Sequence, residues 1–154
     1  MPALRFIILA LAVTGTLTAA DLRLPALFTD HAVLQRERSI PVWGWADAGA
    51  IITVTFDRAK STATADENGR WSLRLPAHAA GGPYQMLVST DSGQTRSFND
   101  LLVGEVWVCS GQSNMQMQVR GVMNADKEIA AAKLPKIRLF QVPMSAKAEP
   151  QDDV

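Results

Sequence analysis

Alternating apolar and polar residues between positions 21 and 102 restrict this part of the chain to β structure. Apolar side chains occupy every second position in 52–56, which is the period of a strand with one buried face. The same period returns in 71–75 after Asn68 and Gly69, a pair that accepts the positive φ angles of a two-residue hairpin turn. Strand signals recur about every 8–12 residues without helical stretches between them, so residues 21–102 predict an all-β, sandwich-like module.

Residues 1–20 have the three-part pattern of a secretory signal peptide. Arg5 supplies an early positive charge, the run 6–17 is mostly apolar and uncharged, and small residues precede a cleavage point after Ala20. The apolar run is shorter than the roughly 20 residues of a membrane-spanning helix, so we expect cleavage and no stable membrane span. The sequence therefore predicts an exported protein, periplasmic or secreted.

Composition excludes several functional classes. The chain has 154 residues, which is about one domain, and 15 Lys and Arg balance 15 Asp and Glu. A nucleic-acid-binding protein usually carries a basic excess, so we expect no nucleic-acid partner. A single cysteine excludes an intrachain disulfide, and two unclustered histidines argue against a structural zinc site. We expect no metal and no cofactor, and the sequence leaves the oligomeric state open.

Three tryptophans of the β module allow two interpretations. Trp43, Trp45 and Trp71 could stack on carbohydrate, or they could be core residues, as large aromatic side chains usually are. We favour the core. His31 and His78 lie in loop-like segments without a partner pattern, and we expect them to be surface or structural residues.

The pattern changes at Gly104. The run 106–109 is continuously apolar, which is typical of a strand buried on both faces in a parallel sheet, and it makes Cys109 a buried strand residue. Glu105 lies roughly 15 Å or more before Ser113 if the chain is extended, and we expect it to be structural.

Residues 103–154 predict the beginning of an α/β domain. Asn124 is a candidate N-cap for a helix over 125–133, and 137–142 is typical of a second strand. Strand, turn, helix and strand make one α/β unit, which is too short for a finished domain. Its unpaired edge should expose apolar surface and promote association.

Ser113 is the candidate nucleophile. It follows the predicted buried strand, at the place where open α/β sheets position their chemistry. Gly111 allows close approach of substrate, and the Ser113 N–H could donate to an oxyanion. The motif departs from the G-x-S-x-G elbow because Met115 occupies the last glycine position. On these residues alone, the favoured interpretation of Ser113 is an ordinary turn residue.

The string S-G-Q-S-N-M at 110–115, within 102–115, closely resembles the first conserved block of the sialate O-acetylesterase family. These proteins are carbohydrate esterases of the SGNH-hydrolase superfamily, and the resemblance implies a flavodoxin-like α/β domain after an N-terminal β domain. It extends from about position 24 to 142. Further segments that resemble the family are 27–35, 41–46, 69–72 and 82–84.

The resemblance implies a serine esterase mechanism on an O-acetylated sugar or glycan. Ser113 would attack the acetyl ester and form an acetyl-enzyme, and water would release acetate. Gly111, Gln112 and Asn114 would form the turn and its oxyanion donors. The family's catalytic Asp and His belong to a later segment, so we interpret the chain as the front part of an esterase that is inactive alone. Alternatives are a related acetyl xylan-type esterase and a secreted, non-catalytic carbohydrate-binding β module.

Overall fold

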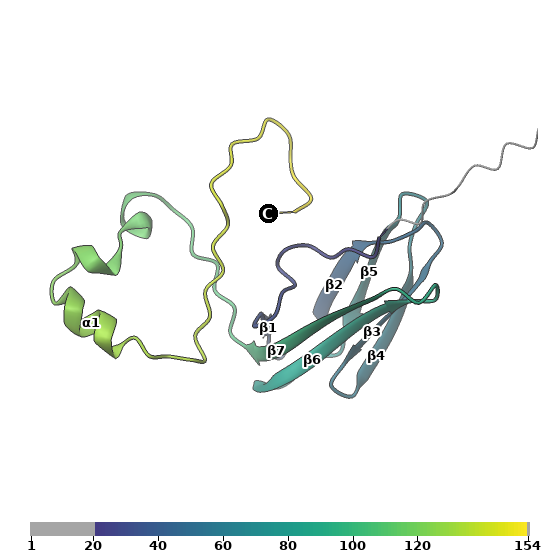
Figure 1. Ribbon diagram of the computed structural model, residues 1–154, viewed down its shortest axis with the longest axis horizontal. Helices are drawn as coiled ribbons and strands as arrows, with labels where there is room; N and C mark the ends of the chain where they lie inside the picture. The colour runs from purple at the N-terminus through teal and green to yellow at the C-terminus, as the bar shows by residue number, and fades with distance from the viewer. Residues whose placement is uncertain (1–20, 154) are drawn as a thin grey trace, which may run out of the picture.

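The computed structural model describes residues 21–153, and the predicted signal peptide lies outside them. Residues 21–104 form a β module, from which the remaining chain extends as mostly irregular structure with short helical turns (Figure 1). The strands are β1 (Val33–Gln35), β2 (Ile40–Trp45), β3 (Ile51–Phe56), β4 (Ala59–Thr64), β5 (Arg70–Leu75), β6 (Gly81–Thr90) and β7 (Thr95–Gly104). The helical segments are η1 (Ser113–Gln116), η2 (Val119–Gly121) and α1 (Ala125–Ala131).

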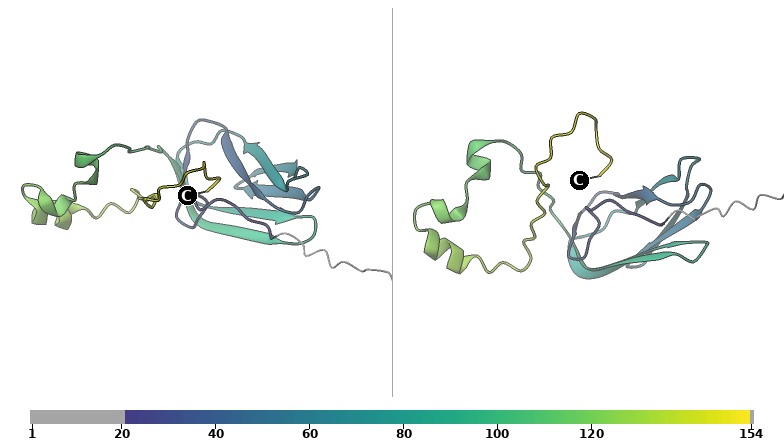
Figure 2. Two further views of the ribbon diagram at one scale, coloured as in Figure 1. Left: turned by 90° about the horizontal axis from the view of Figure 1, so that it is seen from above. Right: turned by 45° about the horizontal axis from the view of Figure 1, so that its top comes forward.

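Two sheets make up the module. Five strands pair in the order β1-β7-β6-β3-β4, and β2 and β5 form a separate antiparallel pair. All neighbours in the larger sheet are antiparallel except β1 and β7, which run parallel with Val33 opposite Leu102. The larger sheet curls as an open half-barrel, and the two-stranded sheet lies against it as a second layer (Figure 2). The predicted all-β character of this part of the chain is therefore confirmed.

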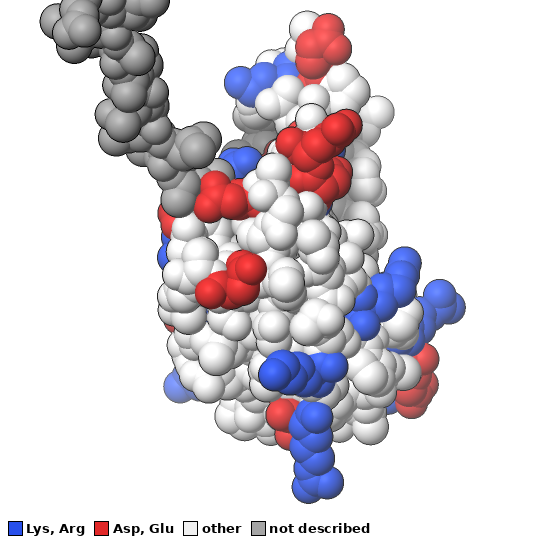
Figure 3. All heavy atoms as spheres, turned by 90° about the vertical axis from the view of Figure 1, so that its right-hand side faces the viewer, with Lys and Arg blue, Asp and Glu red and all other residues white. Residues whose placement is uncertain are grey.

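The core lies between the two sheets and follows the alternation of the sequence. On β3, Ile52, Val54 and Phe56 are fully buried, while the threonines between them are half-buried. Complete burial of such a side chain stabilises a fold by about 1.5–3 kcal/mol. The core residues are Leu22, Leu34, Ile40, Val42, Ala46, Ile52, Val54, Phe56, Ala65, Trp71, Leu75, Met86, Val88, Leu101 and Val103. Charged side chains of both signs are scattered over the end of the module that Figure 3 shows.

The prediction that the turn at Asn68 and Gly69 joins two paired strands of a hairpin is wrong. A turn is present, with Gly69 at φ +74°, but β4 and β5 belong to different sheets. A two-residue type I′ hairpin needs positive φ at both central residues, and only Gly69 has it here. The Asp66 Oδ1 atom accepts hydrogen bonds from the backbone N–H groups of Asn68 (2.8 Å) and Arg70 (2.9 Å). The turn thus carries the chain from one sheet to the other.

The predicted α/β unit is only partly formed. Residues 106–109 and 137–142 are irregular and pair with no strand among residues 21–153, so the predictions of a buried strand at 106–109 and of a second strand at 137–142 are wrong. Cys109 is exposed rather than buried. A strand that is apolar on both faces needs neighbouring strands and covering helices, and the described residues supply neither.

Helix α1 begins where the sequence predicts and ends two residues earlier, at Ala131. Asn124 precedes it in the left-handed conformation, with φ +61° and no hydrogen bond from its side chain to the helix, so the predicted side-chain cap is wrong. Its carbonyl oxygen instead accepts from the N–H groups of Lys127 and Glu128. In the described part of the chain, no helix has the length and apolar character needed to cross a membrane.

Candidate functional site

The turn around Ser113 holds the serine in a strained backbone conformation. Ser113 begins η1 with φ +55°, and Gly111 has φ +145°. A Cβ at Gly111 would lie 2.8 Å from the Met115 Cγ, so the tight turn favours glycine there. A non-glycine residue in the left-handed region costs about 1–3 kcal/mol and is concentrated at functional sites. Five other non-glycine residues among 21–153 share a positive φ, and Ser113 differs from them in lying within the turn that favours glycine at Gly111.

The surroundings of Ser113 are open. Gly111, Gln112, Ser113 and Asn114 are all exposed, and the 3-10 helix is closed by backbone hydrogen bonds, such as that from the Met115 N–H to the Gln112 oxygen (3.3 Å). The structure thus brings together the four residues that the sequence assigns to this turn. It adds no base to them, because no hydrogen bond within residues 21–153 joins Ser113 to a histidine or a carboxylate.

Both histidines of the chain are engaged within the β module. The His31 Nδ1 atom lies 2.6 Å from Asp100 Oδ2. His78 Nδ1 lies 2.7 Å from the Ala79 oxygen and Nε2 lies 3.3 Å from Asp57 Oδ2, and its ring packs edge-on against Phe56. This agrees with the expectation of surface or structural histidines, and neither contacts the Ser113 turn.

Asp100 connects the module to the extended part of the chain. Arg138 donates to both the Asp100 backbone oxygen and its Oδ2 atom, the latter at 3.0 Å. Hydrogen bonds from His31 and Arg138 hold the pKa of the Asp100 carboxyl below its usual value. Sequence reasoning missed this cluster because its members are far apart in the chain and form no motif.

Glu105 fixes the direction in which the chain leaves β7. Gln35 Nε2 donates to its carboxylate at 3.0 Å and Arg36 Nε at 2.7 Å. The Gln35 hydrogen bond and the Arg36 charge lower the pKa of the Glu105 carboxyl. Gln35 Oε1 also accepts from the N–H of Val106 at 2.9 Å, so one side chain of β1 holds two successive residues of the exit. Glu105 therefore has the structural role expected of it.

Apolar side chains cover much of the extended segment. Trp107 is 82% exposed, Val108 is 91% exposed and Leu139 is 94% exposed. The other large apolar residues exposed within 106–144 are Val106, Met115, Met117, Val119, Val122, Met123, Ile129, Leu134, Ile137, Phe140, Val142 and Met144. Such a density of exposed apolar groups exceeds the patches of ordinary monomers and is typical of interaction surfaces and of segments prone to association.

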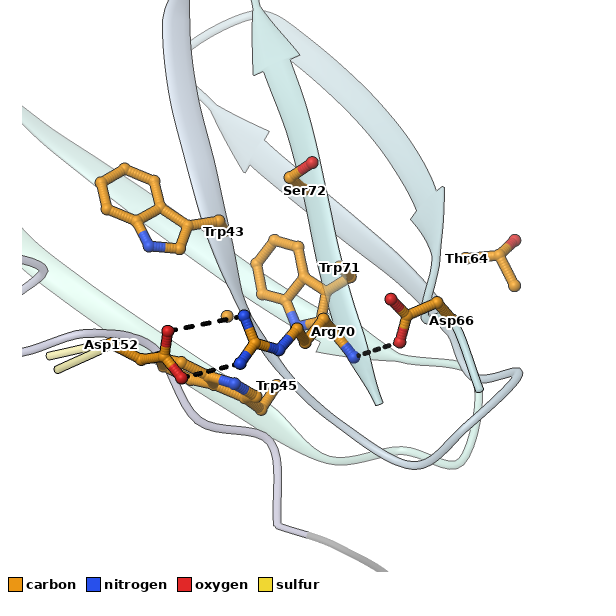
Figure 4. Close-up of a pocket in the computed structure, with 9 residues that line it drawn as sticks. Trp43, Trp45, Thr64, Asp66, Arg70, Trp71, Ser72 and Asp152 are labelled. Carbon is orange, nitrogen blue, oxygen red and sulfur yellow. Dashed lines mark hydrogen bonds and ion pairs between the residues drawn. The ribbon is translucent and has the colours of Figure 1, made fainter. Parts of the chain in front are cut away.

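A second candidate site lies on the outer face of the β2–β5 sheet. Trp43 and Trp45 are half-buried and line a cavity of about 470 Å³ together with Arg70 and Ser72 (Figure 4). Trp71, at 3% exposure, belongs to the core as expected, whereas the expectation that Trp43 and Trp45 are core residues is wrong. Their positions on β2 alternate with buried Val42 and Gly44, so their side chains face away from the core.

Comparisons with known proteins place this geometry in context. No family model matches the chain. Sialate O-acetylesterase of Mus musculus is 31% identical over 164 residues, which covers 99% of this chain, and that of Rattus norvegicus is 33% identical over 143 residues and 86% of the chain. A crystal structure of a carbohydrate acetylesterase from Xanthomonas citri matches with a TM-score of 0.81 and 45% identity over 84% of this chain.

These matches confirm that the chain is homologous to sialate O-acetylesterases along most of its length. The names of these homologues describe them as carbohydrate esterases. The chain spans only 30% of the length of the mouse protein and 30% of the Xanthomonas citri chain.

Proposed function

We propose that this homologue of sialate O-acetylesterases supplies the nucleophile of a carbohydrate O-acetylesterase, and that the nucleophile is Ser113. The observation that carries the proposal is the left-handed backbone of Ser113 directly after a glycine-dependent turn. Nucleophilic serines on α/β folds are held in such strained turns, which expose the hydroxyl to substrate. Gly111, Gln112 and Asn114 form the backbone around it.

In this proposal Ser113 Oγ attacks the carbonyl carbon of an acetyl ester on a sugar hydroxyl. The bond from that carbon to the sugar oxygen breaks, the sugar leaves as an alcohol, and the acetyl group remains on Ser113 until water releases acetate. A histidine must accept the serine proton and return it to the leaving oxygen. Neither His31 nor His78 has a hydrogen bond to the Ser113 turn, so in this proposal the base comes from outside residues 21–153.

We infer from this missing base that the chain alone does not turn over acetyl esters. A serine hydroxyl is a weak nucleophile at its free pKa and gains reactivity from a neighbouring base. The exposed turn also lacks the walls that exclude water and orient a substrate. Acetate release by the purified chain that depends on Ser113 would contradict this inference.

The test of the nucleophile is a chimera. The matching part of the Xanthomonas citri acetylesterase, 45% identical to this chain, is replaced by the corresponding residues of this chain, and acetate release is measured. We expect Ser113→Ala to reduce the rate to background and Ser110→Ala, in the same turn, to retain most of it. Circular dichroism confirms that each variant is folded. A folded Ser113→Ala chimera with undiminished acetate release would refute the assignment.

Two substrate classes compete within this proposal. The mammalian relatives are named for O-acetylated sialic acid, whereas the bacterial relative is named only as a carbohydrate acetylesterase. We propose O-acetylated sialic acid as the substrate, with an acetylated plant polysaccharide such as xylan as the alternative. Parallel measurement of acetate released from the two by the chimera distinguishes them.

A further inference from the structure

We infer that the cavity between Trp43, Trp45 and Arg70 is a binding site for a sugar that carries a carboxylate, such as a uronic or sialic acid. The site belongs to the β module and uses none of the residues around Ser113. The inference therefore stands or falls separately from the proposed esterase function.

The first argument is the aromatic surface. Trp43 and Trp45 project from the same face of β2, at the spacing that places alternate side chains side by side. Phe28 supports Trp43 edge-on with ring centroids 5.1 Å apart, and the Arg23 guanidinium lies 4.2 Å from the centroid of the Trp45 ring. Both indoles are thereby held in place before any ligand arrives. A pyranose ring presents polarised C–H groups that pack on the electron-rich face of an indole.

The second argument is the carboxylate that already occupies the cavity. Asp152, from the end of the described chain, reaches Arg70 with its two oxygens: Nη2 to Oδ2 is 2.7 Å and Nη1 to Oδ1 is 3.5 Å. Figure 4 shows this forked pair beside Trp45. The planar guanidinium of arginine matches a carboxylate in this two-point manner. Asp152 thus displays the chemistry that the site recognises.

The third argument is that Asp152 is a weak occupant. Its side chain is 61% exposed and that of Arg70 is 56% exposed, and such solvent-exposed ion pairs contribute little to stability. A sugar acid would make the same pair with Arg70 and add the contact of its ring with the indoles. It can therefore displace the Asp152 side chain from Arg70.

The remaining wall supplies hydrogen-bonding groups for sugar hydroxyls. Ser72 follows Arg70 on the outer face of β5, and Thr64 ends β4 at the same cavity. The backbone N–H of Arg70 donates a hydrogen bond to Asp66 Oδ1 at 2.9 Å, which holds Arg70 in place. The cavity of about 470 Å³ falls in the range of roughly 300–1,000 Å³ that small-ligand sites occupy.

The experiment uses the full chain labelled with ¹⁵N and follows the indole N–H resonances during titration with the methyl glycoside of N-acetylneuraminic acid, with glucuronic acid and with neutral glucose. We expect the resonances of Trp43 and Trp45 to shift with both acids, and that of Trp107, in the extended segment, to remain unchanged. Glucose should bind about tenfold more weakly, which corresponds to about 1.4 kcal/mol.

Variants separate recognition from folding. Arg70→Gln should weaken binding of the acids about tenfold, whereas Arg74→Gln, on the same face of β5 and bonded to Ser39, should leave it unchanged. Asp152→Ala removes the resident carboxylate and should tighten binding by up to about fivefold.

Three results would overturn the inference. The first is that the indole N–H resonances of Trp43 and Trp45 do not shift when either acid is added at millimolar concentration. Another is equal binding of glucose and of the acids. The third is binding of an aspartate-containing peptide without binding of any sugar acid, which would assign the cavity to a protein partner.

Discussion

The turn that joins the two sheets makes Gly69 a quantitative test of this fold. Its φ angle of +74° lies in the left-handed region, where a residue with a Cβ costs about 1–2 kcal/mol. That Cβ would also lie 2.4 Å from the carbonyl oxygen of Ala46, a backbone atom tied to the turn because the Ala46 N–H donates to the Gly69 oxygen. Forcing such an overlap costs roughly another 1–3 kcal/mol. We therefore expect Gly69→Ala to lower the free energy of unfolding by about 2–5 kcal/mol.

Gly49 provides the matched control. Its φ angle is +79°, yet a Cβ there would have no atom within 4 Å, so Gly49→Ala carries only the conformational part, about 1–2 kcal/mol. Equilibrium urea unfolding, followed by tryptophan fluorescence, gives both values. The total free energy of unfolding of a small domain is only about 5–15 kcal/mol. The Gly69 variant should therefore unfold at a clearly lower urea concentration than the unchanged protein. Equal midpoints for the two variants would refute the argument from the Ala46 contact.

Three further predictions concern the core, one charged cluster and the extended segment. Phe56→Ala, at a side chain with 1% exposure, should lower the unfolding free energy by about 3–5 kcal/mol in the same urea assay, and a loss below about 1 kcal/mol would contradict its core position. The pKa of Asp100 is depressed in the folded state, so its stabilising contribution is present above the unfolded pKa of about 3.9 and disappears as pH falls through the folded pKa. Asp100→Asn should therefore reduce the loss of thermal stability below about pH 4. If the thermal stability of the variant falls with pH as steeply as that of the unchanged protein, the stabilising role of the Asp100 cluster is contradicted. The exposed apolar groups of 106–144 should cause concentration-dependent association in sedimentation experiments, reduced by Trp107→Ser, whereas a monomer at all concentrations would disprove it.

The β module was predictable because its information is local. The alternation in 52–56 and 71–75 predicts which side chains face the core. The structure buries all of them except Leu73, which is half-buried and packs against the core. The pairing of these strands was not local. The turn at Gly69 looks like a hairpin in sequence, but the chain crosses between sheets there, and only the partner strands β2 and β3 decide this.

The site was predictable only where one motif contains it. Gly111 and Ser113 are neighbours in sequence and remain neighbours in space, so the string S-G-Q-S-N-M identified them together. The pairs of Asp100 with Arg138 and of Arg70 with Asp152 join residues 38 and 82 positions apart and leave no pattern in the sequence. The prediction of a buried strand at 106–109 is wrong for a related reason. A strand that is apolar on both faces forms only beside neighbouring strands, and residues 21–153 provide none there.

The parallel pairing of β1 with β7 has a consequence for the order in which the chain folds. Only two residues, Asp57 and Arg58, separate the paired strands β3 and β4. In the β1–β7 pair, Val33 lies opposite Leu102, which is 69 positions later in the chain. Closing a loop of that length costs about 4 kcal/mol of chain entropy, so we expect β1 to dock last, after β7 has left the ribosome. Leu34→Ala should then speed unfolding and leave the folding rate nearly unchanged. Because Gln35 of β1 also holds Glu105 and Val106, the path toward Ser113 becomes fixed only in that final step.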